Sequence, residues 1–354
     1  MQRVIILGGG FAGLRVVSLL SKSSQFEVIL IDRKDYFEVT FAQVAALTAP
    51  VLIGNRSRIL YRHLTQVQFI QDNVIGITNS ELILEKNDKL KFDFLIVATG
   101  SGYSRFEIGK PSTNLSLSQR NQSNQREYQK LFSAQKILII GGGPVGVELA
   151  GEIKSKYKTK EVTLIHSGTR LLPFLKQEAS NKAISLLKDI GVKVELNQRL
   201  QRLDEYNYQG MTNNKTYTAN VVYQTTGAKP NNKVLIDYLP EALDISGQII
   251  VDEFFKVITT ENIYAVGDVN NVPEAKLGFL ANLQGEHLSR NLIRMLSGKK
   301  LKKYKPHKTI AIVPIGRNKG VIQLPLLISG LKFLIRMKTK DFFIAKYLKL
   351  YSDK

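Results

Sequence analysis

One pattern of glycines occurs twice in this chain, and it restricts the fold more than any other feature. The stretch RVIILGGGFAGLRVV near the start and the stretch KILIIGGGPVGVELAGEI near the middle each contain the spacing G-x-G-x-x-G. The glycines of the two copies are Gly8, Gly10, Gly13, Gly141, Gly143 and Gly146. Each copy follows an apolar strand and begins a helical pattern, as in the βαβ unit that binds a pyrophosphate at a helix N-terminus. The chain is therefore predicted to build two dinucleotide sites.

The strand that follows each glycine-rich helix ends in a different residue. FEVILID ends at Asp32, and EVTLIH ends at His166. A carboxylate at this point binds a ribose 2′-hydroxyl and repels a 2′-phosphate, whereas an imidazole does neither strongly. The second site is therefore predicted to accept NADH, NADPH or both, with Arg170 close enough to contact a phosphate. A plain strand-end residue is an equal alternative for His166.

Further strands end in short polar motifs that follow each glycine unit. KFDFLIVATGS closes on Thr99 and Gly100, YQTTGAKPN reaches Gly227, and ENIYAVGD ends at Asp268. A carboxylate at such a strand end can accept a hydrogen bond from a sugar-like hydroxyl. The repetition of strand, glycine turn, helix and strand predicts an α/β fold with two Rossmann-like domains.

Two polar crossings give the predicted domain boundaries. The stretch 109–130, rich in Ser, Asn, Gln and Arg, is interpreted as a linker followed by an exposed helix, and a second crossing lies at 227–233. The predicted segments are a first domain of 1–117 and 234–300, a second domain of 118–233 inserted into it, and a basic α+β segment of 301–354. This last segment is expected to contain a hairpin that turns between Gly316 and Gly320.

The composition excludes several classes of site. The chain contains no cysteine, which excludes disulfides and any redox relay through protein thiols. Its four histidines lack ligand spacing, so no structural metal is expected. No apolar run approaches the roughly 20 residues of a membrane span. We expect neither a secretory signal nor N-terminal myristoylation, and therefore a cytoplasmic protein.

The net charge of +20 is concentrated at the end of the chain. From Lys299 to Lys354 there are 15 lysines and arginines and only two acids. Between these basic residues, apolar ones recur at roughly helical spacing: Leu331, Leu334, Phe342, Phe343, Tyr347 and Leu350. The pattern favours peripheral membrane contact through amphipathic helices, and the alternatives are packing on the chain's own domains or at a homodimer interface. Specific nucleic-acid binding is not expected, because no reader motif accompanies the charge.

The order of motifs GGGFAG, ATGS, GGGPVGVELAGE, TTGAKPN and YAVGD resembles the flavoprotein superfamily with two dinucleotide-binding domains. In that superfamily the first motif binds FAD and the second binds a nicotinamide dinucleotide. EVTLIHS, GVELAGEIKSKY, NIYAVGD, YKP and GRNKG are most similar to the apoptosis-inducing-factor-like branch and its ferroptosis suppressor family, with type II NADH dehydrogenases more distant. The resemblance implies an FAD-dependent oxidoreductase that passes a hydride from NADH or NADPH to flavin, and electrons onward to a ubiquinone-like membrane quinone.

The resemblance also implies which residues form the sites. FAD would contact Gly8, Gly10, Ala12, Gly13, Asp32, Lys34, Val74, Thr99, Gly100 and Asp268, with Lys276 and Leu277 to Phe279 beside the isoalloxazine ring. The nicotinamide dinucleotide would contact Gly141, Gly143, Pro144, Val145, Gly146, Glu148, His166 and Gly227. Glu148, expected in the first turn of the second glycine-rich helix and near the nicotinamide carboxamide, is the candidate catalytic residue. Its alternative role is to complement the dipole of that helix.

Two other functions fit the same residues. One is a flavin-loaded redox sensor or binding protein whose basic tail binds nucleic acid or a protein partner. The other is a soluble ferredoxin or rubredoxin reductase, for which an acidic partner would suit the positive charge.

Overall fold

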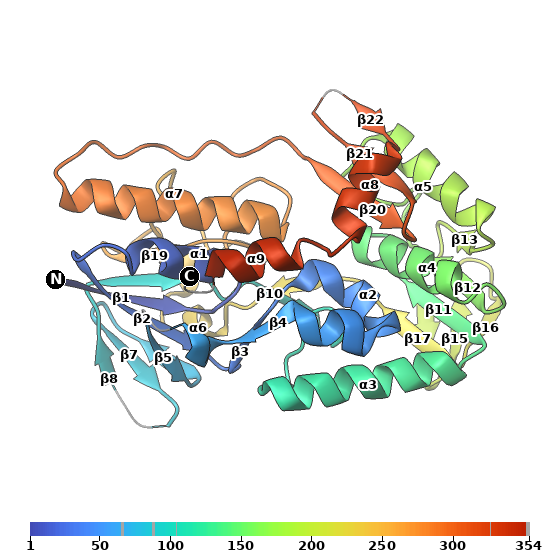
Figure 1. Cartoon of the computed structure of the whole chain (residues 1–354), viewed down its shortest axis with the longest axis horizontal. Coiled ribbons are helices and arrows are strands. Elements are labelled where there is room, and N and C mark those ends of the chain that lie inside the picture. Colours follow the sequence, from blue (N-terminus) through green and yellow to red (C-terminus); the bar gives the residue numbers. More distant parts are fainter. Residues whose placement is uncertain (65–66, 87–88, 104, 326, 352–354) are drawn as a thin grey trace.

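Two parallel sheets, each covered by helices on one face, form the two halves of the molecule (Figure 1). The computed structural model describes residues 1–64, 67–86, 89–103, 105–325 and 327–351. All neighbouring strands of the first sheet run parallel, in the order β19-β9-β1-β2-β5. Its strands are β1 Gln2–Leu7, β2 Phe26–Asp32, β5 Gln68–Gln71, β9 Phe94–Val97 and β19 Ile263–Ala265.

Successive residues of β1 face opposite layers of this first half. Val4 and Ile6 lie in a core with helices α1 (Phe11–Leu20) and α7 (Gly278–Leu296). Ile5 and Leu7 lie in a second core with a three-stranded antiparallel sheet. The strands of that sheet are β6 Val74–Ile77, β7 Glu81–Leu84 and β8 Lys89–Lys91. Because both faces of the parallel sheet are covered, its strands are apolar along their length instead of alternating.

The second half repeats this arrangement of layers. Its parallel sheet has the order β13-β12-β11-β17, with strands β11 Lys136–Ile140, β12 Glu161–Ile165, β13 Lys193–Glu195 and β17 Val221–Gln224. Ile137 and Ile139 share a core with helices α4 (Pro144–Lys156) and α5 (Gln177–Asp189). Leu138 faces an antiparallel sheet formed by β14 Leu200–Arg202, β15 Asn207–Gly210 and β16 Thr216–Thr218. The predicted α/β fold with two Rossmann-like units is confirmed.

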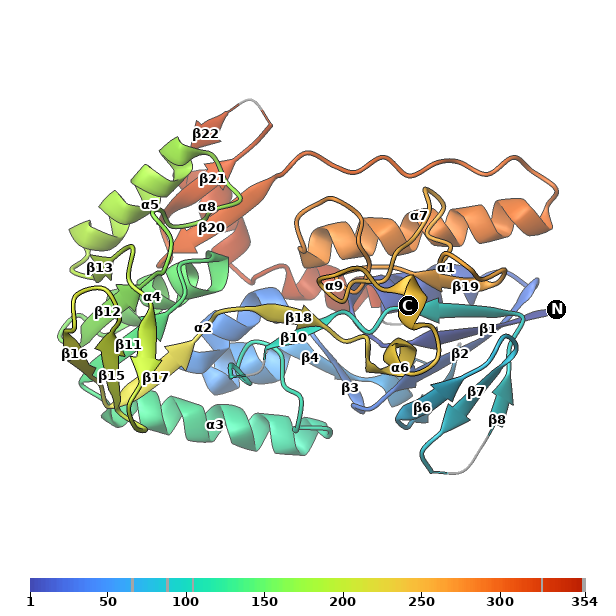
Figure 2. The same ribbon diagram turned by 180° about the vertical axis from the view of Figure 1, so that it is seen from behind.

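The two segments that join the halves pair with each other. Strand β10 (Ser101–Tyr103) follows the first sheet and strand β18 (Ala228–Pro230) follows the second. They form a two-stranded antiparallel ladder in which Ser101 pairs with Pro230 and Tyr103 with Ala228. Figure 2 shows this ladder between the two halves. It places the ends of the two Thr-Gly motifs next to each other.

Helix α3 (Leu117–Ser133) ends the polar crossing, and its first turns are more buried than the composition predicts. It begins with a capping box between Ser116 and Gln119. Arg120 is only 1% exposed, and its guanidinium binds Glu38 at 2.8 and 3.1 Å. Arg58 binds the same carboxylate. The prediction of an exposed helix is therefore wrong at Arg120, because a charged side chain that looks solvated in sequence has a buried partner of opposite charge.

The C-terminal segment contains the predicted hairpin. Strands β20 (Ala311–Ile315) and β21 (Lys319–Gln323) pair antiparallel on either side of the turn, and β22 (Ile328–Ser329) extends the sheet. This sheet packs on α4 and α5, and the irregular stretch 299–310 runs along α7 to reach it (Figures 1 and 2). Helices α8 (Lys332–Thr339) and α9 (Ile344–Tyr351) follow.

The two C-terminal helices have different surroundings. The side chains of Phe342 and Tyr347 are buried in the same core as α1. The prediction that these residues face a membrane is therefore wrong, and packing on the chain's own domain, the stated alternative, describes α9. Helix α8 instead leaves Phe333 three-quarters exposed, and Met337 on this helix and Leu331 just before it are exposed as well.

The remaining elements are short. They are β3 Tyr36–Glu38, β4 Arg58–Leu60, α2 Gln43–Thr48, α6 Lys233–Ile236, a π-helical turn at Pro50–Gly54, and 3-10 turns at Thr40–Ala42, Asn55–Ser57, Tyr61–His63 and Pro240–Ala242. Across the described ranges, none of the helices has both the length and the apolar character needed to traverse a bilayer.

Candidate functional site

The first glycine turn lies between β1 and α1 and leaves room for a ligand. Gly8 has φ of +106°, and a Cβ there would lie 2.5 Å from the carbonyl oxygen of Ala98. A Cβ on Gly13 would collide with the carbonyl oxygen of Gly8. At Gly10, in contrast, a Cβ would meet no atom within 4 Å. This open space at the N-terminus of α1, where backbone N–H groups lack helical partners, fits a pyrophosphate.

Asp32 holds the shape of this turn. Its two carboxylate oxygens accept hydrogen bonds from the backbone N–H of Gly9 at 2.7 Å and of Lys34 at 2.8 Å. Tyr61, a buried residue that sequence reasoning missed, donates its hydroxyl to the carbonyl oxygen of Gly9 at 2.8 Å. The Asp32 carboxylate thus stands beside the turn with lone pairs left for a ribose hydroxyl.

Asp268 binds two residues that follow the first Thr-Gly motif in the chain. Lys110 Nζ and Ser101 Oγ each donate to its Oδ2 at 2.8 Å. Burial disfavours the charged carboxyl, but these two donors hold the pKa of Asp268 below its ordinary value. Sequence reasoning identified Asp268 and missed Lys110 and Ser101, because no local pattern marks either residue as the partner of a carboxylate more than 150 positions away.

The two Thr-Gly motifs meet at Asn231. The Thr99 hydroxyl donates to the Asn231 carbonyl oxygen at 2.7 Å, and the Asn231 amide donates to the Thr99 carbonyl oxygen at 2.8 Å. Gly100 and Gly227 have φ of +68° and +63°, and a Cβ at either would meet no atom within 4 Å. Both glycines therefore border open space at the ladder that joins the halves.

The other predicted FAD contacts differ in what they can offer. Lys276 is mostly buried, and this burial lowers the pKa of its ammonium group. Its Nζ donates to the carbonyl oxygens of Asn270 and Val272. Val74 packs in the core beneath the sheet, and only its backbone remains for a ligand. The other positions are Ala12 in the first turn of α1, Lys34 with its Nζ over the Tyr36 ring, Leu277 at the N-cap of α7, and Phe279, exposed on that helix.

The second glycine turn reproduces the first. Gly141 has φ of +122°, and a Cβ on Gly146 would collide with the Gly141 carbonyl oxygen, while a Cβ on Gly143 would meet nothing within 4 Å. Pro144 and Val145 form the start of α4. His166 Nδ1 accepts a hydrogen bond from the backbone N–H of Gly142 at 3.2 Å, as Asp32 does from Gly9. The residues present therefore fit FAD at one turn and a nicotinamide dinucleotide at the other.

His166 is neutral in this position. Burial lowers the pKa of its imidazole, and Nδ1 serves as an acceptor, which leaves the proton on Nε2. Arg170 donates to the carbonyl oxygen of Pro173 at 2.6 Å. The second turn thus lacks the carboxylate that excludes a 2′-phosphate at the first.

Glu148 lies in the second turn of α4, not in the first as predicted, because the helix begins at Pro144. Its role is therefore not to complement the dipole at the helix N-terminus. Its Oε1 accepts a hydrogen bond from Lys338 Nζ of α8 at 2.8 Å, and Lys338 also donates to the Ile312 carbonyl oxygen. Burial raises the pKa of the Glu148 carboxyl, although Lys338 opposes this shift. Lys338 was missed, since in sequence it belongs to a basic run.

A small cavity lies beside this ion pair, where α2, α4, the hairpin and α8 meet. The cavity is lined by Val44, Ala45, Glu148, Glu152, Pro314, Gly316, Thr339 and Phe342. Glu152 accepts from the Thr48 hydroxyl at 2.8 Å and from Arg317 at 3.3 Å. Four segments far apart in the sequence thus surround two carboxylates and one buried ammonium group.

Comparison with known proteins agrees with this geometry. The family model that matches residues 2–282 is the pyridine nucleotide-disulphide oxidoreductase model. Ferroptosis suppressor protein 1 of Xenopus tropicalis is 34% identical over 97% of this chain and 94% of its own length, and the Homo sapiens protein is 33% identical with the same shares. Apoptosis-inducing factor homolog B of Dictyostelium discoideum is 29% identical over 98% of this chain and 96% of its own length.

Solved structures share the fold at lower identity. The sulfide:quinone oxidoreductase of Aquifex aeolicus has a TM-score of 0.83 at 17% identity, covering 99% of this chain and 92% of that chain. NDH2 of Plasmodium falciparum in complex with NADH has a TM-score of 0.77 at 17% identity, with 99% and 95% covered. Fold, glycine turns and sequence similarity agree: the chain belongs to the pyridine nucleotide-disulphide oxidoreductase family, in the group that includes ferroptosis suppressor protein 1.

Proposed function

We propose that this chain is an FAD-dependent oxidoreductase that takes electrons from NADH or NADPH and gives them to a quinone. The observation that carries the proposal is the pair of open glycine turns, at Gly10 and Gly143, in halves joined by the β10–β18 ladder. When bound, FAD supplies the hydride and electron chemistry. The chain has no cysteine and therefore adds no thiol relay of its own. The protein binds the two nucleotides and orients them.

At the first turn, we assign the residues by the groups that they present. The free N–H groups of α1 and the space at Gly10 receive the pyrophosphate, and the Asp32 carboxylate accepts a hydrogen bond from a ribose hydroxyl. Asp268 accepts a hydrogen bond from a hydroxyl of the flavin's sugar-alcohol chain. Lys110 and Ser101 keep the Asp268 carboxylate ionised and fix its position.

At the second turn, α4 and Gly143 receive the nicotinamide dinucleotide in the same way. His166 stands at this turn with a neutral imidazole in place of a carboxylate, which supports use of both NADH and NADPH. Glu148 is the candidate catalytic residue, placed on the helix that begins at the turn and joined to Lys338.

Reduction of a quinone to a quinol takes up two protons, and the Glu148–Lys338 pair is proposed to hold and release them in the second half of the reaction. The cavity beside the pair has a volume of about 10 Å³, which is room for one water molecule and not for a quinone ring. The quinone is therefore not assigned to this cavity.

A lipid-soluble acceptor suits a protein that contacts a membrane, and α8 is the proposed contact. This helix exposes Phe333 and Met337 together with the basic residues Lys332 and Arg336, and its two flanking residues, Leu331 and Lys340, are exposed as well. An amphipathic helix of this composition binds anionic lipid surfaces. The homodimer and the domain boundaries after residues 117, 233 and 300 stay predictions, to be tested by sedimentation and limited proteolysis.

An anaerobic titration of the purified protein tests the proposal. NADH and then NADPH should bleach the flavin absorbance, and a short-chain ubiquinone should restore it. A protein that purifies colourless and binds no added FAD contradicts the proposal at its first step. Flavin that is reduced but not reoxidised by quinone would instead support the redox-sensor alternative. Turnover with ferredoxin or rubredoxin but not with quinone would support the reductase alternative.

A further inference from the structure

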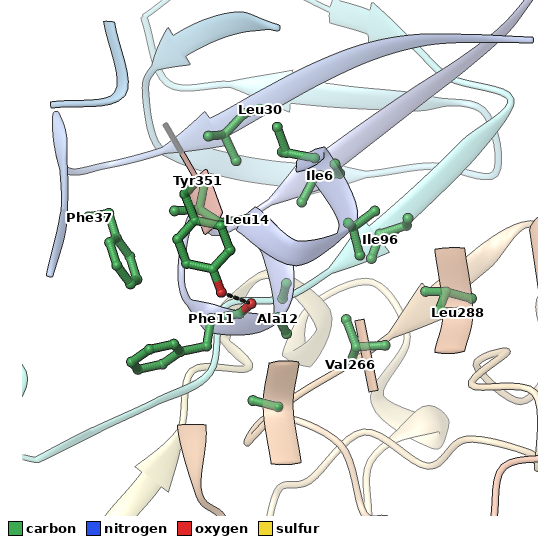
Figure 3. Close-up of a cluster of buried hydrophobic side chains, with 14 of the residues drawn as sticks. Ile6, Phe11, Ala12, Leu14, Leu30, Phe37, Ile96, Val266, Leu288 and Tyr351 are labelled. Atoms are coloured by element: carbon green, nitrogen blue, oxygen red, sulfur yellow. Dashed lines mark hydrogen bonds between the residues drawn. The ribbon is translucent and has the colours of Figure 1, made fainter. Parts of the chain in front are cut away.

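The last described residue of the chain contacts the first glycine-rich helix (Figure 3). The Tyr351 hydroxyl donates a hydrogen bond to the carbonyl oxygen of Phe11 at 3.0 Å and accepts one from Asn282 Nδ2 at 2.7 Å. Phe11 is the first residue of α1 and follows Gly10 directly. Residues 340 positions apart thus meet at the turn assigned to the FAD pyrophosphate.

Aromatic rings fix this contact. Tyr351 is 3% exposed, and its ring stands edge to face with Phe37 at 5.1 Å between centroids. Tyr347, one turn earlier in α9, packs on the Phe11 ring at 4.8 Å. Helix α9 is therefore part of the wall around the first turn of α1.

Helix α7 packs so closely against the first turn of α1 that two of its positions have room only for glycine. A Cβ on Gly285 would lie 2.5 Å from the Ala12 carbonyl oxygen, and one on Gly278 would lie 2.6 Å from the Phe11 ring. Asn282, on the same helix, provides the hydrogen bond to Tyr351. The first turn of α1 is thus held between α7 and α9.

The hydrogen bond from Tyr351 acts on one particular peptide group. The Phe11 carbonyl and the Ala12 N–H belong to the same planar peptide, so fixing the carbonyl fixes the direction of the N–H. The Ala12 N–H is among the first-turn donors of α1 that have no helical acceptor. Such donors bind phosphate oxygens at the start of glycine-rich helices.

We infer that Tyr351 is a positioning residue for FAD: through the Phe11 carbonyl it orients the Ala12 N–H toward the pyrophosphate, and α9 thereby belongs to the flavin site. The inference rests on FAD binding at the first glycine turn. It also means that α9 cannot move away to a membrane surface without weakening the binding of FAD. By linkage, bound FAD stabilises α9 to the same extent that α9 stabilises bound FAD.

Tyr351→Phe tests the inference with the loss of one oxygen atom, and Tyr347→Phe is the matched control. Tyr347 is also buried in α9, but no hydrogen bond joins its hydroxyl to α1 within the described ranges. Each variant is stripped of flavin and titrated with FAD, and the melting temperature of the apoprotein is recorded. Loss of one hydrogen bond predicts a dissociation constant about 3- to 10-fold higher for Tyr351→Phe, and a change of less than about twofold for Tyr347→Phe.

A lower melting temperature of the Tyr351→Phe apoprotein with an unchanged dissociation constant would mean a purely structural role and would overturn the inference. If Tyr351→Phe does not fold, amide hydrogen exchange of the parent protein decides. FAD should then slow exchange across residues 344–351, and equal exchange with and without FAD overturns the inference. A parent that binds FAD and reduces quinone while Tyr351→Phe binds FAD equally well removes only this inference. A parent that binds no FAD removes the proposed function as well.

Discussion

Lys338 and Glu148 form an ion pair, with 2.8 Å between Nζ and Oε1, that joins the C-terminal helix α8 to the helix of the second glycine turn. Both side chains are mostly buried, at 11% and 15% exposure. The basic segment of the chain is therefore not only a charged surface. One of its lysines is part of the candidate catalytic site, and this position makes the pair testable.

Lys338→Met should lower the free energy of unfolding by about 2–4 kcal/mol, because it leaves the Glu148 carboxylate buried without its partner. The double variant Glu148→Gln/Lys338→Met should recover most of that loss, since both charges are then absent. Lys340→Met, at an exposed lysine near the end of the same helix, is the control and should change stability by less than about 0.5 kcal/mol. Urea denaturation of the parent, Glu148→Gln and these three variants measures the values, and purely additive effects of the two single substitutions would contradict the pair.

The stability of the parent relative to Glu148→Gln should depend on pH. Burial raises the pKa of Glu148 above its ordinary value of 4.5, so the folded chain keeps this proton at a pH where the unfolded chain has released it. The unfolded chain then binds fewer protons, and the free energy of unfolding falls as the pH rises through this window. The free energy of unfolding of the parent should therefore fall relative to that of Glu148→Gln as the pH rises from about 4.5 toward neutrality. A difference that stays constant over this range, in denaturation curves recorded at several pH values, would show that the pKa is not raised.

Gly10→Val and Gly143→Val should separate the two nucleotide sites. A Cβ at either position would meet no protein atom within 4 Å, so both variants should fold, but each side chain would fill the space assigned to a pyrophosphate. Gly10→Val should purify without flavin. Gly143→Val should retain flavin and raise the KM for NADH about tenfold or more, a cost of at least about 1.4 kcal/mol in binding. Absorbance spectra and steady-state rates measure both effects, and retained flavin in Gly10→Val would exclude the first turn as the FAD site.

His166→Asp should make the enzyme selective for NADH. The new carboxylate can accept the Gly142 N–H as Asp32 accepts that of Gly9, and it would repel a 2′-phosphate. We expect kcat/KM for NADPH to fall about tenfold relative to NADH. His166→Asn, which adds no charge, is the control and should leave the ratio of the two values near that of the parent. An unchanged ratio in His166→Asp would place the ribose elsewhere.

Phe333→Ser should weaken binding to vesicles that contain anionic lipid. Phe333 is the most exposed apolar residue of α8, and burying a phenylalanine in the lipid interface contributes roughly 1.5–3 kcal/mol. Cosedimentation should show about tenfold weaker binding. Phe132→Ser, at an exposed phenylalanine of α3, should bind vesicles like the parent. Equal loss in both variants, or loss in neither, would exclude α8 as the contact.

Local patterns were enough to predict the elements around each turn. The helix that begins after the second glycine turn and the strand that ends at Asp32 agree with the structure, because glycine spacing and apolar runs are short-range signals. The hairpin around Gly316 is also as predicted, since turn residues between two apolar runs specify it locally. Glu148 lies on the predicted helix but in its second turn, because it is the fifth residue from Pro144 and a turn holds 3.6 residues.

The residues alone predict the two βαβ units, the position of each glycine turn, and the acid or histidine beside it. The folded chain adds the contacts of Tyr61 with Gly9, of Lys110 with Asp268, and of the C-terminal helices with both candidate sites. The two sets of features differ in how far apart along the chain their residues lie. A turn or a helix depends on residues a few positions apart, whereas a partner 100 or more positions away is chosen by the path of the whole chain, and composition does not distinguish a buried lysine from a solvated one.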